Sequence, residues 1–248
     1  MKKIFTLVFM AVMAISVKAQ TYILDINKMY EDAKNKSGML SNAALNSGSV
    51  SKYLLNDATY TQDIFTVVSK SNRTYRIDLY NPDNTEDSYD YGDYVAKARL
   101  EPNGASNSTG GRQMFIDVPE KGALYIGAWT GTTGRKLVVC SATDKTSYIN
   151  VANVTNPILS EALEASAETK TKVFEANLEP GTYCITQDAS IYFAYVKFVV
   201  GAVASGINGV TVDGVENTNA PVYNLAGQRV SKDAKGLLIH NGKKYIAK

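Results

Sequence analysis

Residues 113–141 read QMFIDVPEKGALYIGAWTGTTGRKLVVCS. Three runs rich in apolar, β-branched and aromatic residues are separated here by the turn-forming segments Glu120–Gly122 and Gly131–Gly134. β-Branched and aromatic side chains favour strands because they pack well on a pleated surface, whereas glycine favours turns. The stretch therefore predicts three short strands in succession, at residues 113–118, 123–130 and 136–141.

The same rhythm of strand and turn continues on both sides of this stretch. Ile64–Val68 is a compact apolar run, and in Thr74–Tyr80 apolar and charged residues alternate with the period of a half-buried strand. Further strands are predicted at residues 172–178, 182–186 and 191–200. Many short strands with regular turns, and no alternation of strands with helices, predict an all-β, jelly-roll-like β-sandwich over residues 20–202.

Helix is expected at two places only. Pro157–Ala167 is predicted to be helical because its leucine, isoleucine and alanine residues can share one face. Met29–Lys34 is long enough for about one helical turn.

The first nineteen residues have the order of a secretory signal peptide. Lys2 and Lys3 precede an apolar run, Ile4–Val17, and Ala19 places a small side chain before Gln20. The alternative, a membrane anchor, needs ~20 apolar residues, and this run is shorter. We therefore expect cleavage before Gln20 and export to the cell surface, the medium or the periplasm. No other stretch is apolar enough to predict a transmembrane span.

Net charge argues against nucleic acid as a partner. Removal of residues 1–19 takes away 3 of the 26 basic residues and none of the 24 acidic ones, which leaves 23 − 24 = −1. Nucleic-acid-binding proteins carry a basic patch or stripe instead.

The last part of the chain differs in composition. Small residues at 203–208 predict a linker. Beyond it, residues 222–230 read VYNLAGQRV and residues 235–244 read KGLLIHNGKK, in which alternating residues and Asn241-Gly242 predict short strands and a hairpin. Residues 209–248 are therefore expected to form a small β domain.

These two tail segments closely resemble a Bacteroidetes-type C-terminal sorting domain, of the type A-like class read by type IX secretion. The shared features are the paired strand around Tyr223-Asn224-Leu225, the Lys235-Gly236-Leu237 strand and the final Asn-Gly-Lys-Lys turn. Leu238 replaces the usual aromatic residue, and His240 stands where an aliphatic one is common. The resemblance implies the secretion machinery as a partner; the alternative is an ordinary terminal β domain without a sorting role.

The middle of the chain bears a second, weaker likeness. Residues 118–141, together with residues 174–200 (FEANLEPGTYCITQDASIYFAYVKFVV), resemble the jelly-roll modules that accompany secreted polysaccharide-degrading enzymes. The likeness implies carbohydrate binding or structural support.

Catalytic motifs are few. The one histidine, His240, lies in the tail, so a Ser-His-Asp or Cys-His arrangement is not available to the main domain. Histidine metal clusters are excluded there as well, and no phosphate-binding loop is present. A glycosidase needs only two carboxylates, which the acidic residues could supply, but no pair is singled out. The prediction is a protein that is not an enzyme.

Exposed aromatic residues are the candidates for sugar binding, because their flat faces stack on sugar rings. Trp129 stands at a predicted strand end beside a turn, and Tyr89, Tyr91 and Tyr94 lie in or beside the acidic loop 83–93. Each has a structural alternative: a core position for the tryptophan, and packing back onto the sheet for the tyrosines.

The acidic loop raises the question of a metal. Its acidic residues are a candidate for a structural calcium ion, although the spacing lacks the calcium-loop pattern and a solvated loop is the alternative. They are Asp83, Glu86, Asp87, Asp90 and Asp93. No other cofactor is predicted.

The two cysteines, Cys140 and Cys184, both lie in predicted strands. Export would allow a disulfide between them, and the alternative is a pair of buried free thiols. Together these patterns predict an exported, non-catalytic binding module with a polysaccharide as its expected partner. A structural or adhesive surface protein is the alternative, and a glycan-active hydrolase is the second alternative.

Overall fold

The computed structural model describes residues 20–70, 74–80, 88–102, 112–165 and 170–204, and in the tail residues 222–224, 229–231, 236–240 and 243–247. The chain forms two compact units, Met1–Asn208 and Gly209–Lys248.

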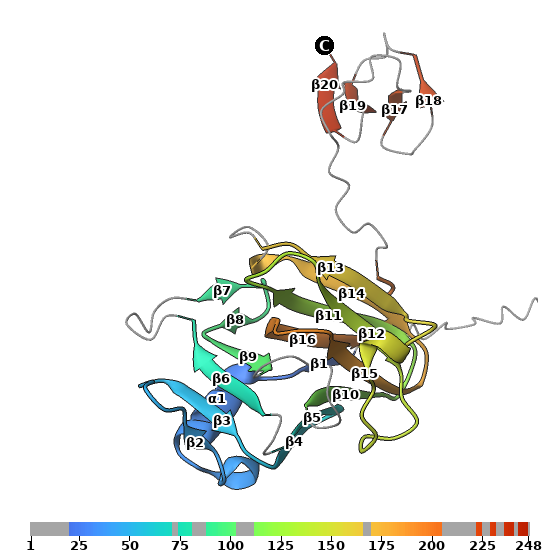
Figure 1. Cartoon of the computed structure of the whole chain (residues 1–248). Helices are drawn as coiled ribbons and strands as arrows, with labels where there is room; N and C mark the ends of the chain where they lie inside the picture. The colour runs from blue at the N-terminus through green and yellow to red at the C-terminus, as the bar shows by residue number, and fades with distance from the viewer. Residues whose placement is uncertain are drawn as a thin grey trace, which may run out of the picture. The chain divides into compact units, whose positions relative to one another are not determined.

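The larger unit is built on two antiparallel sheets, as Figure 1 shows. In spatial order, sheet A contains β14 (Val173–Leu178), β11 (Gly122–Trp129), β16 (Tyr192–Val200), β9 (Ala98–Pro102), β6 (Tyr75–Leu79), β3 (Lys52–Leu55) and β2 (Ala44–Leu45), with β1 (Thr21–Ile23) also paired to β16. Sheet B contains β13 (Leu159–Leu163), β12 (Arg135–Ser141), β15 (Gly181–Gln187), β10 (Gln113–Val118), β5 (Phe65–Ser69) and β4 (Ala58–Gln62). A separate hairpin pairs β7 (Tyr89–Asp90) with β8 (Val95–Ala96).

The chain passes repeatedly from one sheet to the other. Strands β10, β11 and β12 lie in sheets B, A and B, and β14, β15 and β16 lie in A, B and A. This is the pattern of a jelly-roll-like sandwich, so the all-β fold class is confirmed.

Alternate residues of each strand form the core between the sheets. Leu124 and Ile126 of β11 face Ile116 and Ile185 of sheet B in one buried cluster. Helix α1 (Ile26–Lys34) closes the core beside β3, β6 and β9 and buries Ile26, Met29, Tyr30 and Ala33. Each large apolar side chain buried in this way stabilises the fold by roughly 1.5–3 kcal/mol.

The predicted strands within residues 64–141 and 172–200 are all present, and the predicted turn at Met29–Lys34 is part of α1. The predicted helix at Pro157–Ala167 is wrong, because Leu159–Leu163 forms β13 on the edge of sheet B. Its buried residues, Leu159 and Leu163, are four positions apart, and this spacing fits a strand as well as a helix.

The tail unit is a four-stranded antiparallel sheet. Its strands are, in spatial order, β18 (Arg229–Val230), β17 (Val222–Asn224), β19 (Gly236–His240) and β20 (Lys243–Ala247). The expected signal peptide, residues 1–19, and most of the expected linker lie outside the described residues. Across the described part of the chain, no helix has the length and apolar character to cross a membrane.

Candidate functional site

The outer face of sheet A, turned away from the core, carries an aromatic cluster. The four aromatic residues predicted to bind a ligand lie together here, from the end of β11 and from the β7–β8 hairpin. Three more tyrosines join them, one directly after β6 and two from β16. The cluster consists of Tyr80, Tyr89, Tyr91, Tyr94, Trp129, Tyr192 and Tyr195.

Trp129 is the centre of this cluster and is not a surface platform. Its exposed fraction is 3 %. The Tyr80 ring stacks on it at 5.1 Å between centroids, and the Tyr192 ring does so at 5.4 Å. Tyr89 lies at 5.8 Å. Five tyrosines of the cluster are partly exposed: Tyr80, Tyr89, Tyr91, Tyr94 and Tyr192.

Tyr91 and Tyr94 hold the hairpin to the rest of the unit. The Tyr91 ring stacks on Tyr195 at 4.8 Å, and its hydroxyl donates to the Lys170 carbonyl at 2.6 Å. The Tyr94 hydroxyl accepts from the Asn27 backbone N–H at 3.0 Å and donates to Asp25 Oδ1 at 3.2 Å. These two tyrosines are therefore structural contacts of the hairpin.

An ion pair fastens the same hairpin to β16. Asp93 accepts from the Tyr195 hydroxyl and from Lys197 Nζ, both at 2.7 Å. Partial burial acts to raise the pKa of Asp93, but the bonds from Lys197 and Tyr195 outweigh it and lower that pKa overall.

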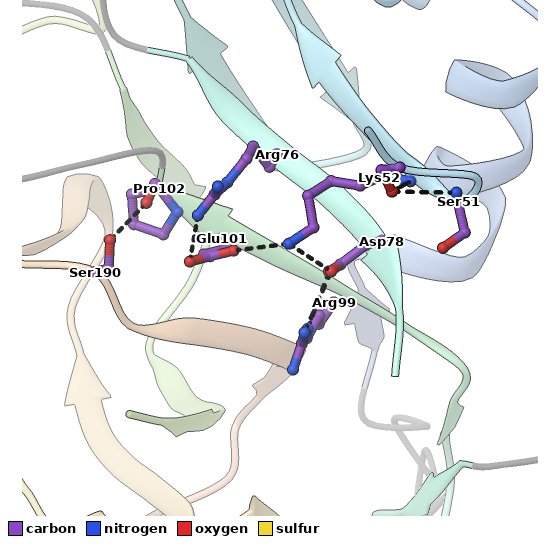
Figure 2. Close-up of polar contacts among 9 residues, drawn as sticks. Ser51, Lys52, Arg76, Asp78, Arg99, Glu101, Pro102 and Ser190 are labelled. Atoms are coloured by element: carbon purple, nitrogen blue, oxygen red, sulfur yellow. Dashed lines mark hydrogen bonds and ion pairs between the residues drawn. The ribbon is translucent and has the colours of Figure 1, made fainter. Parts of the chain in front are cut away.

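Beside the aromatic cluster, the outer face of sheet A carries a network of charged side chains, drawn in Figure 2. The charge network consists of Lys52, Arg76, Asp78, Arg99 and Glu101. In β6 and in β9, charged residues at alternate positions share one face while Ile77 and Leu100 point into the core.

Strand register places opposite charges across from one another in this network. Asp78 is directly opposite both Lys52 of β3 and Arg99 of β9, and Arg76 is directly opposite Glu101. Cross-strand pairs of opposite charge stabilise a sheet by roughly 0.2–1 kcal/mol each.

Each of the four carboxylate oxygens lies within ion-pair distance of a cation. Arg99 binds Asp78 through two nitrogens, with Nε to Oδ1 at 2.9 Å and Nη2 to Oδ2 at 3.2 Å. Lys52 Nζ lies between the two carboxylates, 3.2 Å from Asp78 Oδ2 and 3.7 Å from Glu101 Oε2 (Figure 2). Arg76 Nη2 is 2.5 Å from Glu101 Oε1.

The charge network and the aromatic cluster meet at Arg99 and Tyr192. The guanidinium carbon of Arg99 lies 4.4 Å from the centre of the Tyr192 ring and 6.0 Å from that of Tyr80. A cation over a ring face is attracted by roughly 0.5–2 kcal/mol. The two groups therefore form one continuous surface, here called the sheet A face.

The sequence alone did not indicate Tyr80, Tyr192, Tyr195 or any residue of the charge network as part of a site. The alternation Arg76-Ile77-Asp78 is visible in the sequence as a strand with one charged face. Its partners on β3 and β9 are distant in the chain, and nothing in one sequence indicates that they lie beside it.

The metal prediction is tested only in part by the described residues. Asp83, Glu86 and Asp87 lie outside them. Asp90 accepts from the Gly92 backbone N–H at 2.7 Å, and Asp93 is engaged as above. Within the described ranges, no group of three or more histidine, cysteine or acidic residues could hold a metal ion.

The two cysteines lie on the outer face of sheet B. Cys140 of β12 is directly opposite Cys184 of β15, and both are buried free thiols beside Phe115. Burial raises the pKa of the Cys140 thiol, and burial together with the neighbouring Cys140 raises that of Cys184 further.

A hollow of about 350 Å³ lies on the same sheet, over β4 and β5. Threonine hydroxyls line it, but its described lining includes no aromatic ring. Lys145 at its edge is bound to Asp117 and to Thr66 Oγ1. It is less suited than the sheet A face to stack against a sugar.

Comparison with known proteins gives no family. No protein-family model matches the chain, and no curated protein matches it. One solved structure comes from work on the Ruminococcus flavefaciens cellulosome and an expansion in glycan recognition. It has a TM-score of 0.30 at 10 % identity, and the match covers 56 % of this chain and 84 % of the other chain. CBM29_1, a family 29 carbohydrate-binding module from Piromyces equi, has a TM-score of 0.25 at 16 % identity. The match covers 75 % of this chain and 93 % of that module. Likeness at this level indicates neither a shared family nor a shared ligand.

Proposed function

We propose that the larger unit is a non-catalytic carbohydrate-binding module and that the sheet A face is its saccharide-binding surface. The observation that carries this proposal is the contact between Arg99 and Tyr192. It places a partly exposed aromatic ring directly beside a partly exposed hydrogen-bonding group on a rigid sheet. Sugar rings are bound by this combination, in which the ring face supplies apolar contact and the polar group fixes orientation.

Binding to a panel of polysaccharides tests the proposal, with the chain from Gln20 to Lys248 and affinity electrophoresis as the measurement. Tyr192→Ala should weaken binding by roughly 5- to 30-fold, the equivalent of about 1–2 kcal/mol of stacking. Tyr125→Ala is the matched control. Tyr125 of β11 is a partly exposed tyrosine on the same outer face of sheet A as Tyr192, but it lies beside Lys197 and not beside Arg99.

A structural or adhesive surface protein is the second candidate. Trp129 favours it, since the ring best suited to a sugar is enclosed by neighbouring tyrosines. If the folded chain binds no polysaccharide on a broad panel, the carbohydrate proposal is lost and this candidate remains.

The site of action proposed for the module is outside the cytoplasm. The pattern of residues 1–19 supports cleavage before Gln20, and mass spectrometry of exported protein with Met1 intact would contradict it. The resemblance of the tail supports a sorting role for residues 209–248. In a host with type IX secretion, their deletion should then retain the protein in the periplasm.

A further inference from the structure

The cations of the charge network are more exposed to solvent than its carboxylates. The side chains of Asp78 and Glu101 are each 6 % exposed, whereas those of Lys52, Arg76 and Arg99 are 24 %, 21 % and 20 % exposed. Three cations against two anions leave the network at 3 − 2 = +1. A ligand that approaches this surface therefore meets the cations first.

The hydrogen-bonding groups that the network leaves available to a ligand are mainly donors. The two carboxylates are 6 % exposed, and each of their oxygens lies within ion-pair distance of Lys52, Arg76 or Arg99. Each guanidinium has five N–H groups, and the bonds that Arg99 and Arg76 make here use only Nε and Nη2 of the former and Nη2 of the latter. No residue in the described ranges bonds to Nη1 of either. The charge network thus presents donors to solvent, and its acceptors are nearly buried.

This imbalance discriminates between kinds of sugar. A neutral sugar hydroxyl is both donor and acceptor. The two carboxylates of the network are nearly buried and are poorly placed to accept a hydrogen bond from it. A carboxylate or sulfate group only accepts, and its bonds to arginine and lysine are the strong, charge-assisted kind. Tyr192 and Tyr80 beside the network are partly exposed and would supply apolar contact for the sugar itself.

We propose that the saccharide recognised by the sheet A face is acidic, a pyranose chain whose carboxylate or sulfate group binds over Lys52, Arg76 and Arg99. This inference rests on the proposed carbohydrate-binding function and specifies its ligand class.

Two matched pairs of polymers test the ligand class, with isothermal titration of the chain from Gln20 to Lys248. Polygalacturonate and its methyl ester differ in the carboxylate, which the ester replaces with a neutral group, and dextran sulfate and dextran differ in the sulfate. At least one acidic member should bind about tenfold or more tightly than its neutral partner, the equivalent of one charge-assisted bond. The pair that shows this difference identifies the acidic group, and binding should weaken as added salt screens the charges.

A substitution test separates this surface from a general attraction to polyanions. Lys52→Gln leaves Arg99 on Asp78 and Arg76 on Glu101, so the fold should persist, and it should weaken binding of the acidic polymer about tenfold. Lys136→Gln removes an exposed lysine from β12 of sheet B and should leave binding unchanged. Thermal unfolding of each variant checks the fold.

The outcomes are distinguishable. Equal binding of acidic and neutral partners overturns the acidic class but leaves carbohydrate binding standing. Equal losses for Lys52→Gln and Lys136→Gln overturn the assignment to this surface. Binding of no polymer in either pair, or of any saccharide on the wider panel, removes the proposed function together with this inference.

Discussion

The ring of Tyr91 lies over the backbone of Gly127, so closely that a Cβ added at this glycine would come within 2.6 Å of the tyrosine Cε1 atom. Tyr91 belongs to the β7–β8 hairpin and Gly127 to the middle of β11. The absence of a side chain on β11 therefore lets the hairpin pack flat against the sheet, where Tyr91 also stacks on Tyr195.

Gly127→Ala should displace the hairpin, because the new methyl group also comes within 2.9 Å of Tyr195 Cβ. Overpacking of this kind costs about 1–3 kcal/mol of the free energy of unfolding, which urea denaturation would measure. Gly131→Ala is the control, since a Cβ there meets no atom within 4 Å. Equal stability of the two variants would contradict the packing.

Trp129 is expected to behave as a core residue. It is the chain's one tryptophan, so intrinsic fluorescence reports on this site alone. The emission should be blue-shifted and protected from acrylamide until the protein unfolds. Trp129→Ala should lower the free energy of unfolding by about 3–5 kcal/mol, and Trp129→Phe by much less. Full quenching of the native protein would show instead that the indole is open to solvent.

The two cysteines are expected to remain thiols. The Ala142 N–H donates to the Thr182 carbonyl at 2.9 Å, and the ladder repeats every two residues, so Cys140 and Cys184 form a hydrogen-bonded pair as well. Cβ atoms in such pairs are about 5.5 Å apart, wider than the ~3.5–4.5 Å that a disulfide spans.

Titration with a thiol reagent at pH 8 checks this expectation. Burial raises both thiol pKa values, so little thiolate is present and both cysteines should react only after unfolding. An intact mass lower by the two hydrogens of a disulfide, in protein recovered after export, would refute the expectation.

Alkaline pH should destabilise the fold through its tyrosines. Burial raises the pKa values of Tyr30 and Tyr91 to about 12, against about 10 in the unfolded chain. Between these values the unfolded chain has released protons that the folded protein keeps. The stabilisation is therefore complete below pH ~10 and is lost as the pH rises toward 12.

Absorbance at the tyrosinate band, followed together with circular dichroism, measures this effect. Ionisation of the buried tyrosines should coincide with unfolding. If all tyrosines ionised near pH ~10 while the β-sheet signal persisted, their burial would be disproved.

The strands of the sandwich could be predicted because their signal is local. The period-two pattern around Ile77 and the turns beside residues 123–130 lie within a few positions of the strands that they define. Where one spacing fits two structures, as at Leu159 and Leu163, the pattern alone failed, and pairing with β12 decided in favour of a strand.

The site was less predictable because it depends on pairing between distant segments. The sequence indicated Trp129 and three tyrosines of the hairpin region as candidates, and these four residues do lie together in the aromatic cluster. Their burial follows from partners that one sequence does not reveal: Tyr80 and Tyr192 against the indole, and Tyr195 against Tyr91. A bulge opposite Gly127 and Ala128 helps to place Tyr192 and Tyr195.

Glu101→Gln separates the two roles of the charge network. The substitution preserves the shape of the side chain but removes the negative charge that Arg76 and Lys52 share. The glutamate side chain is only 6 % exposed, so its loss leaves Arg76 poorly paired. The free energy of unfolding should fall by about 1–3 kcal/mol. Glu179→Gln is the control, because its ion pair with Lys121 is exposed and contributes roughly 0–1 kcal/mol.

Affinity for an acidic saccharide should change in the opposite direction. Without the Glu101 charge the network rises from +1 to +2, and Arg76 is free to bind the ligand in place of the carboxylate. Titration of the variant at a temperature where it is fully folded should therefore show binding several-fold tighter than that of the native chain, roughly the effect of one additional charge at a partly screened surface. A purely structural network predicts the loss of stability with no gain in affinity, and that result would assign the five charged residues to the fold alone.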